Sequence, residues 1–149
     1  MVTGGFGDET LNNVGNVTGW GSISNLTLVN SGGITANVDG STLTITTNRG
    51  GFTNNGGVST TGLNASIVIN AAGHGPAANN GTMIISIGSS IAVNGNFGQS
   101  NNGSLVVGID FDSIGDSFGV SRKFINSGDV SINGSNAALE PAQLSTPEA

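Results

Sequence analysis

The sequence contains no cysteine, and it has little proline, few aromatic residues and few charges. Proline occurs 3 times, tryptophan once and tyrosine not at all, and charged residues make up 8% of the chain. Without cysteine, neither a disulfide framework nor a thiolate metal site can form. Disordered chains are normally rich in charge and proline, so the scarcity of both argues against disorder.

Basic residues are especially scarce. Lys and Arg number 3 against 9 Asp and Glu, which gives a formal net charge of -6. This charge repels phosphate backbones and anionic lipid head groups, so we expect no nucleic-acid partner and no membrane surface as a partner. No apolar run approaches the roughly 18 residues of a membrane span, so membrane insertion is not expected either. The first residues lack the basic region and apolar core of an export signal.

What the sequence does contain is glycine, asparagine, serine and threonine around a small apolar fraction. Glycine occurs 26 times among 149 residues, and the apolar share is 36%. The apolar residues are mostly Val, Ile, Leu and Phe, which suit a pleated, half-buried surface. The length fits one domain. The composition therefore predicts a single all-β folding unit.

One short pattern recurs six times: Asn, any residue, Gly, any residue, and an apolar residue that opens an extended stretch. The copies begin at Asn13, Asn30, Asn54, Asn79, Asn101 and Asn126. The steps between successive copies are 17, 24, 25, 22 and 25 residues. A large apolar residue lies two positions before the Asn in four copies, whereas Ala77 and Gln99 depart from this rule. Near-even spacing of this kind is typical of a repeat architecture.

Each copy is interpreted as a corner of the chain. Asn and Gly tolerate positive φ, so they can turn the backbone sharply, and asparagines stacked one per coil can hydrogen-bond along the stack. Between the corners, stretches such as 42–46 and 66–70 alternate apolar and polar residues, the period of a strand with one buried face. A single unit cannot bury its apolar face, but stacked units can.

The prediction is an all-β chain folded as a right-handed parallel β-helix (β-solenoid) of about six coils. The solenoid is expected over residues 1–135, with 136–149 as a polar linker or disordered tail. The competing fold is an antiparallel sandwich, in which the Asn-Gly pairs at 55–56, 80–81 and 102–103 would form hairpin turns. The regular spacing of the corners favours the solenoid.

Several segments resemble the repeats of filamentous-haemagglutinin-like and autotransporter-like surface proteins of bacteria. They are the stretches 28–36, 41–45, 52–58 and 124–130, and the resemblance extends over roughly residues 11 to 135. It implies a parallel β-helical protein that is exported to the cell surface or the extracellular space and serves in adhesion, biofilm matrix or display. The repeat contains no catalytic residues, so the resemblance implies none here.

Three carboxylates form the densest polar group in the sequence. Asp110 and Asp112 are two residues apart on an expected strand and share a face, and Asp116 follows in the adjoining turn. Such a set of oxygen ligands is a candidate calcium site, and no other cofactor is expected. The alternative is that both strand aspartates point into water while their apolar neighbours pack inward.

Other chemistry finds little support in the sequence, and the chain is not expected to be an enzyme. A polysaccharide-active site would need carboxylates such as Asp110 and Asp112 together with basic or aromatic groups, which are rare here. His74 lies in a glycine-rich insertion without a nucleophile at a recognisable spacing. The row Thr42, Thr44 and Thr46 suggests an ice-binding face, but such a face needs a flat array of threonines, and a single row does not form one. Trp20 is expected to cap the first coil.

The ends of a solenoid present unpaired backbone groups that can pair with another strand. Here neither end carries an obvious covering helix, which favours a longer array or end-to-end stacking of copies into a filament. The expected function is therefore a structural module of a surface fibre or matrix that has itself as its partner. The alternative is an adhesin module whose lateral face binds glycan or a host protein.

Overall fold

The computed structural model describes residues 1–6, 8–71, 75–86, 88–100, 102–107, 123–126 and 130–132. Within these residues the chain forms strands and turns only, and no helix long and apolar enough to cross a membrane is found in them. The strands in chain order are β1 (Val2–Thr3), β2 (Thr10–Asn13), β3 (Asn16–Thr18), β4 (Gly21–Asn30), β5 (Gly33–Ala36), β6 (Thr42–Asn54), β7 (Gly57–Thr60), β8 (Ser66–Asn70), β9 (Ala77–Asn79), β10 (Thr82–Ile85), β11 (Ser90–Asn94), β12 (Phe97–Gln99), β13 (Ser104–Val107), β14 (Lys123–Asn126) and β15 (Val130–Ile132).

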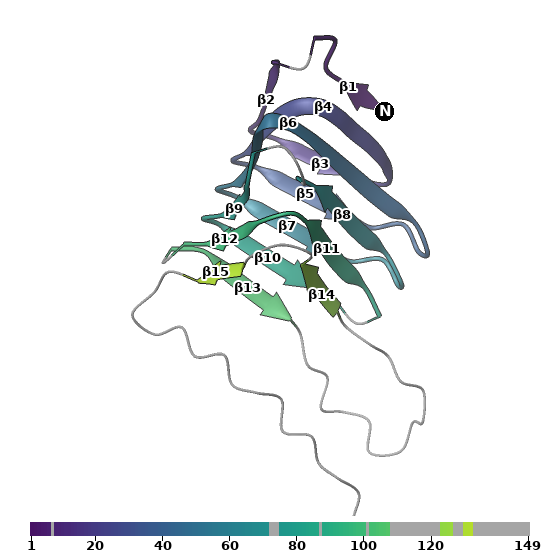
Figure 1. The fold of residues 1–149 in the computed structure, drawn as a ribbon. Helices are drawn as coiled ribbons and strands as arrows, with labels where there is room; N and C mark the ends of the chain where they lie inside the picture. The colour runs from purple at the N-terminus through teal and green to yellow at the C-terminus, as the bar shows by residue number, and fades with distance from the viewer. Residues whose placement is uncertain are drawn as a thin grey trace, which may run out of the picture.

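The strands stack in three columns, and all the pairings are parallel (Figure 1). Column 1 contains β1, residues 21–24 of β4, residues 42–46 of β6, β8, β11 and β14. Column 2 contains β2, residues 27–30 of β4, residues 52–54 of β6, β9, β12 and β15. Column 3 contains β3, β5, β7, β10 and β13. The long strands β4 and β6 thus turn a corner and serve two columns.

This arrangement is a parallel β-solenoid, as the sequence predicted. About four full coils run from β4 to β13, and the six coils expected include the shorter first coil and the last one. The first coil has only the two-residue β1 in column 1, and β14 and β15 belong to the last. The antiparallel sandwich is wrong, because the Asn-Gly pairs at 55–56 and 80–81 join strands of neighbouring columns and not antiparallel partners.

Rows of apolar side chains, with one member per coil, fill the interior. Three of the rows are Ile23, Ile45, Ile69 and Val93 in column 1, Leu11, Leu28, Phe52, Ala77 and Phe97 in column 2, and Val17, Ile34, Val58, Met83 and Leu105 in column 3. In the middle coils these side chains are fully buried, whereas Leu11 and Val17 of the first coil are only half-buried. Each buried side chain of this size contributes about 1.5–3 kcal/mol, and only stacking makes that burial possible.

Ala77 occupies the same inward position as the large residues of its row. It lies in register between Phe52 and Phe97, and all three side chains are buried. Interiors are packed to a nearly constant density, so a small residue between two phenyl rings leaves the room that the rings require. The departure from the apolar rule at Ala77 is therefore a matter of volume and not a break in the repeat.

The corner glycines follow a different logic from the one expected. Positive φ is found at Gly19, Gly21, Gly40, Gly51, Gly88 and Gly95, and none of these belongs to the Asn-x-Gly pattern. At the corner, stacked backbones approach too closely for a side chain: a Cβ on Gly32 would collide with the carbonyl oxygen of Gly15. Gly56 meets Gly32 in the same way, and Gly81 meets Gly56. The explanation by positive φ was wrong, and close approach is the cause.

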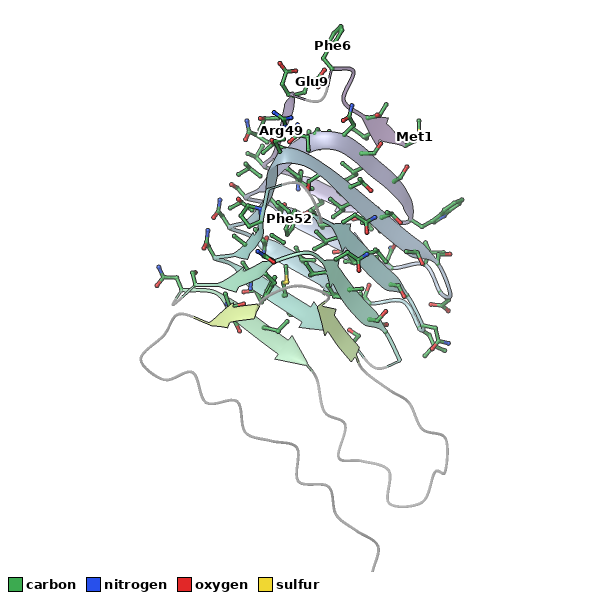
Figure 2. The ribbon with its side chains drawn as sticks, in the orientation of Figure 1. Met1, Phe6, Glu9, Arg49 and Phe52 are labelled. Atoms are coloured by element: carbon green, nitrogen blue, oxygen red, sulfur yellow. The ribbon has the colours of Figure 1, made fainter. Side chains whose placement is uncertain are left out.

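The Phe52 ring gives a direct test of the core. Figure 2 shows Phe52 inside the stack, and its side chain is completely buried. We expect Phe52→Ala to lower the free energy of unfolding by about 3–5 kcal/mol, because the neighbouring Ala77 cannot fill the space that remains. Urea denaturation measures this change. The control is Ile84→Ala on the outer side of column 3, where the side chain is 42% exposed and the change should be small; equal effects of the two variants would contradict the assignment of inside and outside.

Candidate functional site

The best-defined polar feature of the molecule is a ladder of buried amides at the ends of the column 2 strands. Asn13, Asn30, Asn54 and Asn79 are in register in successive coils. The Nδ2 group of each donates to the Oδ1 atom of the next, with 2.7 Å for all three bonds. The sequence predicted corners at these four positions, and the hydrogen bonds now define what they do.

Asn13, Asn30 and Asn54 also bond the backbone of two coils, and Asn79 bonds that of the next coil. Asn30 Nδ2 lies 3.3 Å from the carbonyl oxygen of Gly32 in its own coil and 3.0 Å from that of Gly57 in the next. Asn54 repeats this with Gly56 at 3.3 Å and Thr82 at 3.1 Å. The Asn-x-Gly spacing thus has two causes, because the glycine two residues on supplies an acceptor and also lacks the Cβ that would block stacking.

The fifth member of the ladder is Gln99, which corrects the expected corner at Asn101. Asn79 is in register with Gln99, and Asn79 Nδ2 donates to Gln99 Oε1 at 2.9 Å. The cause is a longer corner: Thr82 follows Asn79 by three positions, whereas its register partner Ser104 follows Gln99 by five. Asn101 itself lies outside the described residues.

Asn126 does not belong to the ladder either. It ends β14 in column 1, where its register partner is Val93, and the column 2 position after Gln99 is Ile132. The local Asn-x-Gly pattern misled here because it recurs by chance in a chain rich in both residues. Register along the stack, and not the local pattern, identifies a corner.

A second ladder lies at the ends of the column 1 strands and was missed from the sequence. Asn94 Nδ2 donates to Asn70 Oδ1 at 2.6 Å, and Asn70 Nδ2 donates to Thr46 Oγ1 at 3.2 Å. These three residues are half-buried and in register. Their donors point toward the first coil, opposite to those of the corner ladder. Their even sequence separation of 24 residues was the signal that could have revealed them.

Hydroxyl groups continue this pattern on the outer surfaces. Thr42, Ser66 and Ser90 are in register, and the Ser66 and Ser90 hydroxyls are 3.0 Å apart. The central row of the same face, however, runs from Thr44 to Val68 and Ala92. The threonines of 42–46 are therefore not repeated as a threonine plane in the neighbouring coils.

The first coil has an edge that no described strand covers. The corner ladder begins here at Asn13, whose Oδ1 atom accepts no hydrogen bond from the described residues, and a Cβ on Gly15 would meet nothing. Glu9 Oε1 accepts hydrogen bonds from the backbone nitrogens of Gly5 at 2.9 Å and Phe6 at 2.8 Å. In this arrangement Phe6 projects away from the stack and is 94% exposed (Figure 2).

Trp20 does not cap the first coil. It lies in the turn before β4, between two glycines of positive φ, and its side chain is 70% exposed. The expectation of a buried cap was wrong, because the turn directs the indole outward instead of over Leu11 and Val17. The interior of the first coil is correspondingly left half-covered.

The remaining site residues predicted from the sequence lie outside the part of the chain that the structure describes. Asp110, Asp112, Asp116 and His74 lie outside the described residues, as do residues 136–149. Among the residues that are described, no three His, Asp or Glu side chains lie close enough to hold a metal ion. The calcium site thus stays a prediction from the sequence.

Comparison with protein-family models, with characterised proteins and with solved structures gives no match to this chain. The resemblance to filamentous-haemagglutinin-like and autotransporter-like repeats stays a prediction.

The corner ladder is tested by removing one amide from its middle. Asn54→Leu leaves buried groups of Asn30, Asn79 and the corner backbone without partners, so we expect a loss of roughly 2–4 kcal/mol in the free energy of unfolding. The matched control is Asn55→Ala, which removes only an exposed bond from Asn80. Thermal and urea denaturation compare the two. A neutral Asn54→Leu would show that the ladder does not hold the coils together.

Proposed function

We propose that this chain is a structural module of an extracellular or cell-surface fibre or matrix of bacteria, and that copies assemble end to end through their strand edges. The observation that carries the proposal is the open edge of the first coil. Of the eight large apolar side chains that the described part of the chain exposes, four lie within the first 14 residues, in the first coil: Met1, Val2, Phe6 and Val14. Apolar groups gathered beside unpaired strand edges favour association.

The internal construction supports a fibre role. Backbone hydrogen bonds in three columns and side-chain bonds in two ladders all run from coil to coil, along the stack. The strand pairings and the ladders join each coil to its neighbours, so one more coil adds the same interactions again, whether it belongs to the same chain or to another. A protein built in this way forms a stiff rod, which suits a fibre or a biofilm matrix. The role requires no catalytic residues.

The location outside the cell rests on the sequence. It follows from the resemblance to bacterial surface repeats and from a composition that is poor in charge and rich in Asn, Thr and Gly. The formal net charge of -6 disfavours nucleic acid as a partner. The partner proposed here is the chain itself.

The proposed assembly is measurable with purified protein. We expect sedimentation velocity to show species that grow with concentration, and electron microscopy to show fibres. Because the strands run across the stack, aligned fibres should give a meridional reflection near 4.8 Å, the spacing of neighbouring strands. Monodisperse short rods at every concentration would contradict the proposed function.

A second candidate function is adhesion through a lateral surface. Trp20, Val38 and Leu63 are exposed in the successive turns that precede the column 1 strands, and Leu63 N donates to Asp39 Oδ1 of the neighbouring turn at 2.8 Å. An exposed indole beside aliphatic side chains is a surface that glycans or proteins bind.

The adhesin alternative predicts binding that depends on the indole. If it holds, a glycan or host-protein array should show signals that Trp20→Ala abolishes and that Ile84→Ala, on the outer side of column 3, leaves unchanged. An array without signals for the unchanged protein would remove the support for this role.

A further inference from the structure

We infer that assembly is head to tail: the open edge of the first coil receives the last coil of a second copy, and Gly15 is the position that admits it. This inference rests on the proposed function and specifies its interface and its polarity.

The first step is the glycine at the corner of each coil. Gly32, Gly56 and Gly81 lack the room for a Cβ because the carbonyl oxygen of the preceding coil occupies it. Gly15 is the equivalent residue of the first coil, since Asn13 and Asn30 are in register and each glycine lies two residues further on. A Cβ on Gly15 would meet nothing within 4 Å, and its φ is not positive. The first coil therefore has the shape that accepts a preceding coil.

The second step is the edge of β2 next to this corner. The strand pairs with β4 on one side, and no described strand pairs with its other side. Asn13 Oδ1 accepts no bond from the described residues, although Oδ1 of Asn30, of Asn54 and of Asn79 each accepts from the preceding coil. The open backbone edge of β2, the Asn13 Oδ1 atom and Gly15 thus all face the position that a preceding coil would occupy.

The third step identifies the occupant as the opposite end of a second copy. Asp8 and Glu9 stand beside the first-coil edge, so two such edges facing each other would bring like charges together. The last described strands of columns 1 and 2 are β14 and β15, which pair with β11 and β12 on one side, and no described strand pairs with their other side. A parallel register that continues from β15 of one copy to β2 of the next therefore favours contact of head with tail.

The contact between copies is weaker than the contact between coils of one chain. At the column 2 corner the last coil has Ile132, which offers no amide donor to Asn13 of the next copy. The association then depends on backbone pairing of β15 with β2 and on the covering of Leu11, which lies in β2. A reversible, concentration-dependent assembly is the expected result.

Gly15→Ala separates assembly from folding. The added methyl meets nothing in the single chain but would collide with an incoming coil, so the melting temperature of the unassembled chain should stay unchanged. The concentration needed for assembly should rise at least about tenfold, because a methyl forced into a close-packed contact is costly. Gly32→Ala is the matched control, since it introduces the same collision within the chain and should lower the melting temperature.

Cysteine cross-linking gives the polarity, because the natural chain has no cysteine. Asn12 in β2 and Ser131 in β15 are at equivalent positions of column 2. Parallel neighbours about 4.8 Å apart lie within the Cα separation of a disulfide. A mixture of Asn12→Cys and Ser131→Cys proteins should therefore form mixed dimers under oxidation. Dimers of Asn12→Cys alone, without mixed ones, would indicate contact of head with head and overturn the inference.

The outcomes separate the two proposals. If the natural chain assembles and Gly15→Ala assembles equally well, the inferred interface is wrong while the proposed function stands. If the natural chain stays a monomer at every concentration, both are wrong. Assembly that is lost in Gly15→Ala and cross-links in the mixed cysteine pair supports both.

Discussion

The corner, where one coil lies on the next, is the constraint on which the rest of this structure depends. The strands of three columns can all pair only if the backbones of successive coils also lie equally close to each other at the corners, where the chain turns. Glycine makes that approach sterically possible at Gly32, Gly56 and Gly81, and a buried asparagine satisfies the carbonyl groups that the turn removes from water. Without either, the strand spacing could not be kept around the corner, and the apolar rows inside would lose contact.

The same constraint explains why the chain has so few charges. In a stack of in-register repeats a side chain often has one of its own kind as neighbour, so a charged residue repeated in this way would repel the next one. An amide both donates and accepts, and a hydroxyl does too, so identical residues can satisfy one another. Asn30 with Asn54, Asn70 with Asn94 and Ser66 with Ser90 are such pairs. The composition is thus a consequence of the stacking.

The sequence was sufficient for the fold and for four ladder residues, because even spacing of Asn-x-Gly reflects one coil per repeat. It failed where coil length changed: two extra residues after Gln99 moved the pattern to Asn101, and Asn126 matched the pattern while lying in another column. The sequence also predicted positive φ at the corner glycines. The close approach of backbones that are far apart in sequence cannot be inferred until the register is known. The prediction that Trp20 caps the first coil failed for a similar reason, because the two glycines of positive φ on either side of Trp20 set the direction of its side chain.

The two ladders give the stack a direction. The amide donors of the corner ladder point from Asn13 toward Gln99, whereas those of the second ladder point from Asn94 toward Thr46. Rows of amides polarise one another when they point the same way, and two opposed rows on different corners limit the dipole that would otherwise build up along the rod. The corner row nevertheless begins with an acceptor, Asn13 Oδ1, and passes through Gln99 to Ile132. Because its two ends differ in chemistry, a contact between copies that continues this row has to join unlike ends. Such contacts do not give two-fold dimers, and they generate open filaments where the rotation between copies does not close a ring.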